Sequence, residues 1–325
     1  MDELYMLLAI QEARKFIGAT APNPPVGACL VKDGKILSTA GHKRAGGDHA
    51  EIRAIKQAIE KFGFQSVRGS TLYVTLEPCN HTGKTPPCTG AIIECGIERV
   101  VFGISDPNPS VEGGGAQKLR QAGLIVEEDL LAMECFELIA GFSKWAQAKK
   151  PWVVQKLAYR INEDYRLSLI PEKNMKTFTT EQSLLVAHEE RKKADAILTG
   201  MGTIRIDQPF FTVRKVPDHP GKKRILAVLT KRDPSLSSVL SWKERQASLG
   251  FEVVAYRDIE EALENLGQRG IQRVLVEAGP TVSTQILRQN LWDERLIFLH
   301  LNSDFDMVHR QCSQESLKNL AKFIN

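Results

Sequence analysis

Short apolar segments with the composition of strands alternate with helical segments along the chain, and this alternation constrains the fold more than any other feature. Strands that alternate with helices predict layered α/β domains. In the first half, residues 26–42 read as a two-stranded hairpin that turns at Lys32, Asp33 and Gly34. We expect further strands at 71–76, 99–104 and 124–129, and helices at 4–17, 49–62, 87–95, 115–122 and 130–148.

A second α/β pattern begins after Lys149, Lys150 and Pro151, which mark the expected domain boundary. A chain of 325 residues has room for two domains of ordinary size. We therefore expect one α/β domain over residues 1–147 and another over residues 151–325. The strands of the second domain are expected at 152–158, 195–200, 224–230, 251–256, 273–279 and 295–301.

The composition restricts where the protein works and what it binds. A net charge of +4 on 325 residues is too small to indicate a nucleic-acid partner. No apolar run approaches the roughly 20 residues that cross a bilayer, and acidic residues precede the first apolar stretch, which is the wrong order for a secretory signal. Six cysteines without such a signal favour the cytoplasm, where closely spaced cysteines indicate a metal site or chemistry before disulfides.

Two short motifs supply residues suited to a catalytic zinc site. His49 and Glu51 lie two apart at the start of an expected helix, and Cys79 and Cys88 follow an expected strand. Catalytic zinc takes three protein ligands and leaves one position for water. We therefore expect His49, Cys79 and Cys88 to bind Zn²⁺, and Glu51 to transfer the proton. Each half-motif alone is a weak signal, but together they match the zinc-deaminase signature, in which an activated water replaces an amino group.

Four segments of the first half, APNPPVGACLVKDGKI, GGDHAEIRA, VTLEPCNHTGKTPPC and ISDPNPSVEGGGAQKLRQAGLIV, occur in this order. In these segments the chain resembles the deaminase domain of the bifunctional riboflavin-biosynthesis deaminase/reductase family. The longer gap between Cys79 and Cys88 separates it from cytidine and tRNA adenosine deaminases, which usually have P-C-x-x-C. The resemblance implies a cytidine-deaminase-like α/β/α sandwich. The implied substrate is a diamino-ribosylamino-pyrimidinone 5′-phosphate, whose ring amino group is hydrolysed.

The resemblance also implies substrate contacts in the first half. Asn23 is one of them, together with the loop residues His81, Lys84 and Thr85. His81 is assigned to the substrate or to loop structure, since three metal ligands are already available. The Lys84 ammonium could pair with the ribose phosphate, and a solvated loop lysine is the alternative. Asp106, in the turn DPNP, is expected to organise its own loop.

Two segments of the second half, HEERKKADAILTGMGTIRIDQPFFTVR and VLVEAGPTVSTQILRQNLWDERLIF, resemble the reductase domain of the same family. The resemblance implies a dihydrofolate-reductase-like α/β domain that passes hydride from NADPH to the ribosyl C1′ and opens the sugar to a ribityl chain. The run at 277–281 sits between a strand and a helix, a junction that cradles phosphates on backbone N–H groups. The implied substrate contacts are Arg191, Phe211, Arg214 and Glu277, and the implied cofactor contacts are Thr203, Asp207, Gly279, Pro280, Thr281, Val282, Ser283, Thr284 and Gln285.

The second half departs from the family's pattern at several positions. In place of A-x-S-x-D-G the chain has AYRINE at 158–163, and in place of S-x-W-I-T-G it has KTFTTE at 176–181. Where the family has an Asp-Gly pair this chain has Asn162 and Glu163, which adds bulk and charge where a glycine permits close approach. The tail after residue 301 also differs from the family.

Three functions therefore remain open. The architecture favours a bifunctional deaminase and reductase that acts on a phosphorylated small molecule. The lost glycine and acid favour a deaminase whose second half is structural, so we expect the reductase fold with weak or absent reductase activity. A nucleic-acid deaminase is poorly supported, because the sequence has no basic strip rich in aromatic residues. The family also implies a homo-oligomer, a dimer or tetramer formed through the reductase half.

Overall fold

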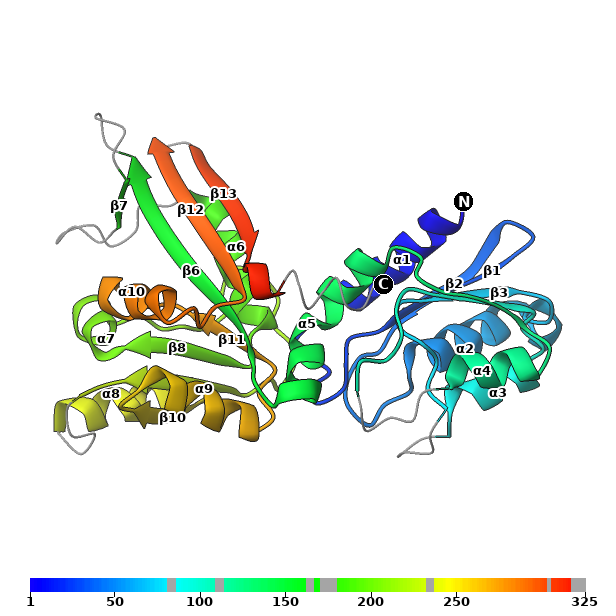
Figure 1. Ribbon diagram of the computed structural model, residues 1–325, viewed down its shortest axis with the longest axis horizontal. Helices are drawn as coiled ribbons and strands as arrows, with labels where there is room; N and C mark the ends of the chain where they lie inside the picture. The colour runs from blue at the N-terminus through cyan, green and yellow to red at the C-terminus, as the bar shows by residue number, and fades with distance from the viewer. Residues whose placement is uncertain are drawn as a thin grey trace. The chain divides into compact units, whose positions relative to one another are not determined.

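The computed structural model describes residues 1–80, 86–108, 114–161, 167–169, 180–231, 237–302 and 305–316. The chain forms two compact units, whose main segments are Met1–Ala148 and Lys149–Leu317 (Figure 1). Both are layered α/β units, as the alternation of strands and helices predicts. None of the helices in the described ranges is long and apolar enough to cross a membrane.

The first unit is built on a five-stranded mixed sheet with the order β2-β1-β3-β4-β5. β1 pairs in antiparallel fashion with β2 and β3, while β3, β4 and β5 are parallel. Parallel strands at one end of the sheet require helical crossovers, and the helices described below supply them. The strands are β1 (Gly27–Lys32), β2 (Lys35–Gly41), β3 (Thr71–Val74), β4 (Arg99–Phe102) and β5 (Ile125–Glu127).

The predicted hairpin is confirmed by the turn between β1 and β2. Asp33 has a φ of 49° and Gly34 a φ of 73°, and Lys32 pairs with Lys35 across the turn. Two consecutive residues with positive φ are typical of a type I′ turn, whose twist matches that of the flanking strands. Aspartate and glycine tolerate this conformation, which is why the sequence indicates the turn so clearly.

Helices cover both faces of this sheet, so the first unit is the expected α/β/α sandwich (Figure 1). One face carries α2 (Ala50–Phe62), α3 (Cys88–Glu94) and α4 (Gly115–Gln121), which share one apolar core with the strands. The other carries α1 (Asp2–Arg14) and α5 (Ala132–Ala148). Because both faces are covered, consecutive residues of β1 are buried instead of alternating between core and solvent.

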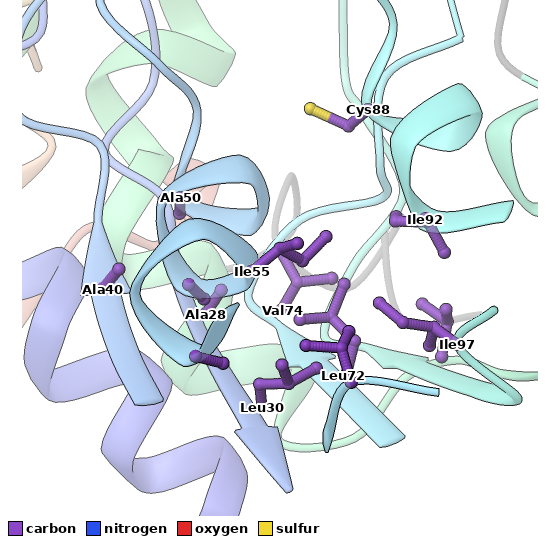
Figure 2. Packing of buried hydrophobic residues seen from close by; sticks show 14 of the residues in the cluster. Ala28, Leu30, Ala40, Ala50, Ile55, Leu72, Val74, Cys88, Ile92 and Ile97 are labelled. Carbon is purple, nitrogen blue, oxygen red and sulfur yellow. The ribbon is translucent and has the colours of Figure 1, made fainter. Parts of the chain in front are cut away.

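The core beneath α2 and α3 fixes where these two helices begin (Figure 2). Leu72 and Val74 of β3 belong to the same cluster as Ile55 of α2 and Ile92 of α3. Cys88 lies at the edge of the cluster, and its sulfur points away from Ile92. The first residues of α2 and α3 are therefore held rigidly beside each other, and they carry the candidate metal ligands.

The second unit is an eight-stranded sheet with the order β10-β9-β8-β11-β6-β12-β13, and β7 pairs with β6 outside this path. Six strands are parallel, while β7 and β13 are antiparallel to their neighbours. The strands are β6 (Trp152–Ile161), β7 (Leu167–Leu169), β8 (Ala196–Gly200), β9 (Arg224–Leu229), β10 (Phe251–Tyr256), β11 (Arg273–Val276), β12 (Glu294–Asn302) and β13 (Phe305–Cys312). The helices are α6 (Glu181–Lys193), α7 (Met201–Asp207), α8 (Ser237–Ser248), α9 (Ile259–Gln268) and α10 (Pro280–Arg288).

All six strands expected in the second half form, and two further strands, β7 and β13, are not predicted from the sequence. The divergent tail supplies β13, which pairs with β12 from Glu294 opposite Cys312 to Asn302 opposite Phe305. β13 has no partner on its other side within the described part of the sheet. Its hydrophobic residues do not alternate regularly with polar ones, so the pattern there is too weak to indicate a strand.

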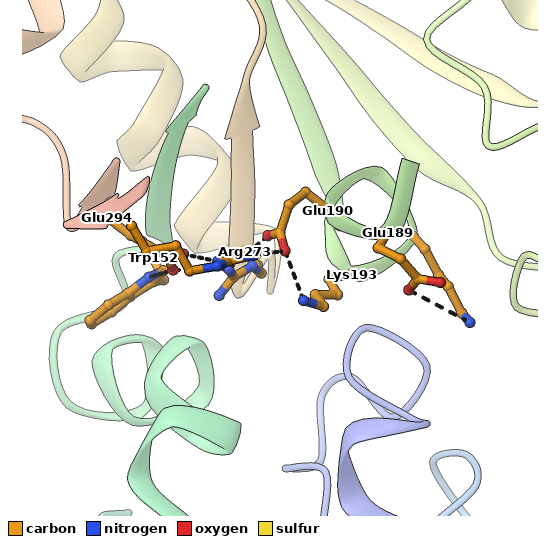
Figure 3. A network of polar contacts seen from close by, with 8 residues as sticks. Trp152, Glu189, Glu190, Lys193, Arg273 and Glu294 are labelled. Atoms are coloured by element: carbon orange, nitrogen blue, oxygen red, sulfur yellow. Dashed lines mark hydrogen bonds and ion pairs between the residues drawn. The ribbon is translucent and has the colours of Figure 1, made fainter. Parts of the chain in front are cut away.

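A buried ion network fixes α6 over the sheet (Figure 3). Arg273 of β11 lies 3.1 Å from Glu190 of α6 and 3.0 Å from Glu294 of β12. Lys193 lies 2.7 Å from Glu190, and Trp152 Nε1 donates to Glu294. Burial alone raises the pKa of the Glu190 carboxyl, but Arg273 and Lys193 lower it well below its usual range. Each buried carboxylate is thus paired, which places α6 beside the second cavity described below.

Candidate functional site

Three metal-binding side chains converge in the first unit. His49 immediately precedes α2, Cys88 is the first residue of α3, and Cys79 lies in the segment after β3. His49 Nδ1 lies 3.5 Å from Cys79 Sγ and 3.3 Å from Cys88 Sγ. The three ligand atoms all lie within 4.8 Å of one another. The structure therefore brings together the three residues that the sequence predicts as ligands.

This set of donors fits a tetrahedral zinc ion. At ordinary Zn–S and Zn–N bond lengths, tetrahedral geometry separates nitrogen and sulfur ligands by about 3.5 Å, close to the separations observed here. Hydrogen bonds from the Cys88 side chain and backbone N–H lower the pKa of the Cys79 thiol to about 4. The same contact raises the pKa of the Cys88 thiol. Ionisation of Cys79 therefore opposes ionisation of Cys88, and a divalent cation bound to both sulfurs would stabilise both as thiolates.

Glu51 lies on the first turn of α2, and its buried carboxyl lines a cavity beside the ligands. Burial raises the pKa of this carboxyl, and the charge of the His49 ring opposes the increase. A carboxyl group beside the reacting atoms can take up a proton and return it within one reaction cycle. The position and environment of Glu51 therefore suit the proton transfer predicted for it.

The cavity beside Glu51 has a volume of about 430 Å³, and a pair of hydrogen bonds orients one of its polar residues. His42 Nδ1 lies 3.1 Å from the Asp48 carbonyl oxygen, and His42 Nε2 lies 3.2 Å from Asn23 Nδ2. Because a carbonyl oxygen only accepts, the ring proton is on Nδ1 and Nε2 accepts from the Asn23 amide. The amide oxygen of Asn23 is then the atom left to accept a hydrogen bond from a ligand.

Several residues that line this cavity are not predicted from the sequence. Asp106 accepts the Asn108 N–H at 2.9 Å, as expected of a residue that organises its turn, but both side chains also line the cavity. Phe142 and Trp145 of α5 contribute aromatic surface, and His42 lines it too. No motif marks α5, so only the fold could have placed its aromatic residues here. The predicted contacts His81, Lys84 and Thr85 lie outside the described residues.

Gly115, the first residue of α4, permits a close approach to the segment that carries Cys79. A Cβ added at Gly115 would lie 2.0 Å from the Pro78 carbonyl oxygen. We expect Gly115→Ala to displace this segment, to lower the free energy of unfolding by about 1–3 kcal/mol, and to weaken zinc retention against a chelator. Gly90→Ala in α3 is the matched control, since no heavy atom of a described residue lies within 4 Å of its added Cβ. Equal zinc loss in both variants would contradict this explanation.

The second unit holds a larger cavity, of about 810 Å³, around a buried ion pair. Glu277 follows β11 and accepts two hydrogen bonds from the Arg191 guanidinium, at 2.5 and 2.8 Å. Lys156 Nζ of β6 lies 3.6 Å from the same carboxylate. Burial alone raises the pKa of Glu277, but Arg191 and Lys156 lower it to about 2, so the carboxylate is ionised at neutral pH. Lys156 lines the cavity and is a residue that the sequence analysis does not assign to the site.

All four substrate residues predicted in this half line the larger cavity, namely Arg191, Phe211, Arg214 and Glu277. Arg214 lies in the chain between α7 and β9, and its guanidinium lies over the Phe210 ring at 5.1 Å. Its backbone N–H donates to His188 Nδ1 at 2.9 Å. His188 also lines the cavity, although the sequence analysis does not single it out.

Most of the predicted cofactor residues line the same cavity. Gly279 immediately precedes α10, and its N–H donates to Thr203 Oγ1 at 2.9 Å. Ser283 and Thr284 are absent from the lining, and Ser283 Oγ instead donates to the Ala278 carbonyl oxygen. Consecutive residues of a helix point in different directions, so a continuous run cannot all face one ligand. The residues that do line the cavity are Thr203, Asp207, Gly279, Pro280, Thr281, Val282 and Gln285.

Comparison with known families assigns both halves of the chain. The family described as "Cytidine and deoxycytidylate deaminase zinc-binding region" matches residues 1–104. The "RibD C-terminal domain" matches residues 170–300. The first match contains His49, Glu51, Cys79 and Cys88, and the second contains the Arg191–Glu277 pair and the Gly279 junction.

Full-length relatives agree with these assignments. The riboflavin biosynthesis protein RibD of Aquifex aeolicus is 37% identical over 321 residues, which are 92% of this chain and 86% of the relative. RibD of Escherichia coli is 32% identical over 98% of this chain and 93% of its own length. The crystal structure of a Thermotoga maritima diaminohydroxyphosphoribosylaminopyrimidine deaminase/5-amino-6-(5-phosphoribosylamino)uracil reductase is 34% identical, with a TM-score of 0.76 over 92% of this chain and 86% of that one. The chain therefore belongs to the RibD family of riboflavin biosynthesis proteins.

Proposed function

We propose that this chain catalyses two steps of riboflavin biosynthesis. The first is the zinc-dependent hydrolytic deamination of a diamino-ribosylamino-pyrimidinone 5′-phosphate, and the second is the NADPH-dependent reduction of its ribosyl group to a ribityl chain. The observation that carries the proposal is the convergence of His49, Cys79 and Cys88 beside the buried Glu51, at the wall of a cavity. The paired Arg191 and Glu277 in a second cavity support the second step.

In the deamination, the ring amino group leaves as ammonia and the oxygen of a water molecule replaces it. Zn²⁺ held by the three ligands supplies Lewis acidity, which lowers the pKa of water toward about 7. Glu51 accepts a proton as the water attacks and donates it to the departing amino group. Asn23, oriented by His42, accepts a hydrogen bond from the substrate and holds it against the ligands. Phe142 and Trp145 provide apolar surface for the pyrimidine ring.

In the reduction, NADPH supplies the hydride. Gly279 and the start of α10 offer backbone N–H groups to the phosphates of the cofactor, and Thr203 holds Gly279 in place. Arg214 offers a planar fork of N–H groups to the substrate 5′-phosphate. Lys231 and Arg257 line the cavity where β9 and β10 end, as cations suited to the additional phosphate that distinguishes NADPH from NADH.

The expected loss of reductase activity rests on Asn162 and Glu163, which lie outside the described residues. The described residues keep features that suit the reaction, because the Arg191–Glu277 pair and the hydrogen bond from Gly279 to Thr203 both lie at the cavity. A domain retained only as scaffold has no need of a buried ion pair at the wall of a cavity. We therefore favour the bifunctional enzyme over a deaminase with a structural second half.

We further infer a cytoplasmic homo-oligomer, a dimer or tetramer. Among the described residues no two cysteines form a disulfide, which suits a reducing compartment. The outer strand β13 exposes Met307 and Val308 at the edge of the second sheet, where a second copy could pair. Sedimentation velocity of the full chain tests the oligomeric state, and a monomer at micromolar concentration would contradict it.

A two-stage assay on the purified, zinc-loaded full chain tests the proposed function. The pyrimidine 5′-phosphate should release ammonia without NADPH, and NADPH added afterwards should be oxidised. Chelation of zinc should abolish ammonia release and leave the NADPH affinity, measured by fluorescence titration, unchanged. Ammonia release without NADPH binding would establish the monofunctional alternative. No ammonia release from zinc-loaded protein would refute the proposed deaminase.

A further inference from the structure

Two side chains of α6 fasten the loop that carries Arg214. His188 Nδ1 accepts the Arg214 backbone N–H at 2.9 Å, and Arg191 Nη1 donates to the Thr212 carbonyl oxygen at 3.3 Å. His188 and Arg191 are three residues apart and therefore share one face of the helix. Phe211, which is 1% exposed, anchors the start of the same loop in an apolar cluster. The loop is thus held by its backbone at Thr212 and at Arg214, on the two sides of Val213.

The contact with Arg214 determines where the His188 ring carries its proton. A backbone N–H can only donate, so Nδ1 is unprotonated and the proton lies on Nε2. His188 is 4% exposed, and burial lowers its pKa to about 4, with Arg191, Arg214 and Lys215 acting in the same direction. Glu277 is the one charge among these neighbours that opposes the decrease. The ring is therefore neutral near pH 7, and Nδ1 remains an acceptor.

We propose that His188 is a positioning residue of the reductase half, which holds the Arg214 loop so that the guanidinium faces the substrate phosphate. The inference rests on the proposed reduction and assigns His188 a role through Arg214 and no direct role in hydride transfer. The side chain of Arg214 is braced separately, because Nη1 donates to Thr212 Oγ1 at 3.0 Å. With both ends of the residue fixed, the guanidinium is preorganised before the substrate arrives, which reduces the entropy lost on binding.

Two substitutions at His188 separate this role from simple space filling. In His188→Asn the amide oxygen lies near the position of Nδ1 and can still accept from Arg214. In His188→Gln the amide lies near the position of Nε2, so the Arg214 N–H loses its acceptor. We expect His188→Gln to raise KM for the deaminated intermediate by roughly 5- to 150-fold, the usual effect of leaving a buried donor unpaired. His188→Asn should stay within about twofold of wild type, and NADPH affinity should be unchanged in both.

A double-mutant cycle tests whether the effect passes through Arg214. In an Arg214→Gln background there is no guanidinium left to position, so His188→Gln should raise KM no further. Non-additive effects of this kind are expected of residues that act as one unit. Independent, additive increases in KM would overturn the proposal, and so would equal effects of the Asn and Gln variants.

A spectroscopic measurement tests the hydrogen bond between His188 and the Arg214 N–H even if the reductase is inactive. In protein labelled with ¹⁵N-histidine, the signal that disappears in His188→Gln should be that of a neutral ring protonated on Nε2, and it should not titrate between about pH 5.5 and 8. A ring protonated on Nδ1, or one that titrates in this range, would refute the role of His188. Wild-type protein that oxidises no NADPH would instead refute the proposed reductase function. The ¹⁵N-histidine signal would still test the His188 contact.

Discussion

Replacing Glu51 by glutamine is expected to lower deaminase turnover by about 100- to 10,000-fold, the usual contribution of a general acid–base group. Glutamine has nearly the same shape as glutamate, but its amide cannot accept and return a proton. The Glu51 carboxyl is buried beside His49, and burial raises its pKa. Ammonia release under saturating substrate measures the loss, and metal analysis should find the same zinc content as in wild type.

A second carboxylate in the same cavity provides the control for Glu51. Glu77 lines the cavity, but its Oε1 accepts the Ala116 N–H at 2.9 Å and fastens the start of α4. Glu77→Gln retains the oxygen that makes this contact, so turnover should remain close to that of wild type. If Glu51→Gln kept more than about a tenth of wild-type turnover, or if both variants lost activity equally, Glu51 would not be the proton-transfer group.

The candidate zinc site was predictable from sequence because its chemistry is local. His49 and Glu51 are two residues apart at a helix start, and Cys79 and Cys88 bracket a single loop, so the spacing alone indicates which side chains can converge. The hairpin between β1 and β2 was predictable for the same reason, since Asp33 and Gly34 determine the turn by their own conformational preferences.

Residues that act through distant contacts were not predictable in this way. Phe142 and Trp145 line the cavity beside Glu51 only because α5 packs on the sheet. No motif near them in the sequence indicates a binding site. His188 looks like any histidine in a charged helix until the fold places Arg214 opposite its Nδ1. Ser283 is predicted to contact the cofactor but does not line the cavity. The sequence shows only a continuous run after Gly279, whereas the helix directs the Ser283 hydroxyl to the Ala278 carbonyl oxygen.

The buried pair of Glu277 and Arg191 should contribute far more to stability than an exposed pair of the same chemistry. Arg191 is 12% exposed and Glu277 8% exposed, so removing the carboxylate leaves a cation in a site with little water. We expect Glu277→Ala to destabilise the second unit by about 3–5 kcal/mol. Glu252→Ala is the matched control, because the Arg269–Glu252 pair is 33% and 59% exposed and should contribute less than about 1 kcal/mol. Hydrogen exchange of peptides from β11 and α6 measures the loss of stability in each of the two variants.

The pH dependence of the stability lost in Glu277→Ala tests whether the loss comes from the ion pair. The pKa of Glu277 falls from 4.5 in the unfolded chain to about 2 in the folded protein, so the pair contributes its full stability above about pH 4.5. That contribution is lost as pH falls from about 4.5 toward 2, because the unfolded chain then takes up a proton on Glu277 that the folded, ion-paired carboxylate does not, and this favours unfolding. The gap in stability between wild type and Glu277→Ala should therefore narrow between about pH 5 and 3. A gap that stays constant over this range would mean that the variant loses packing and not an ion pair.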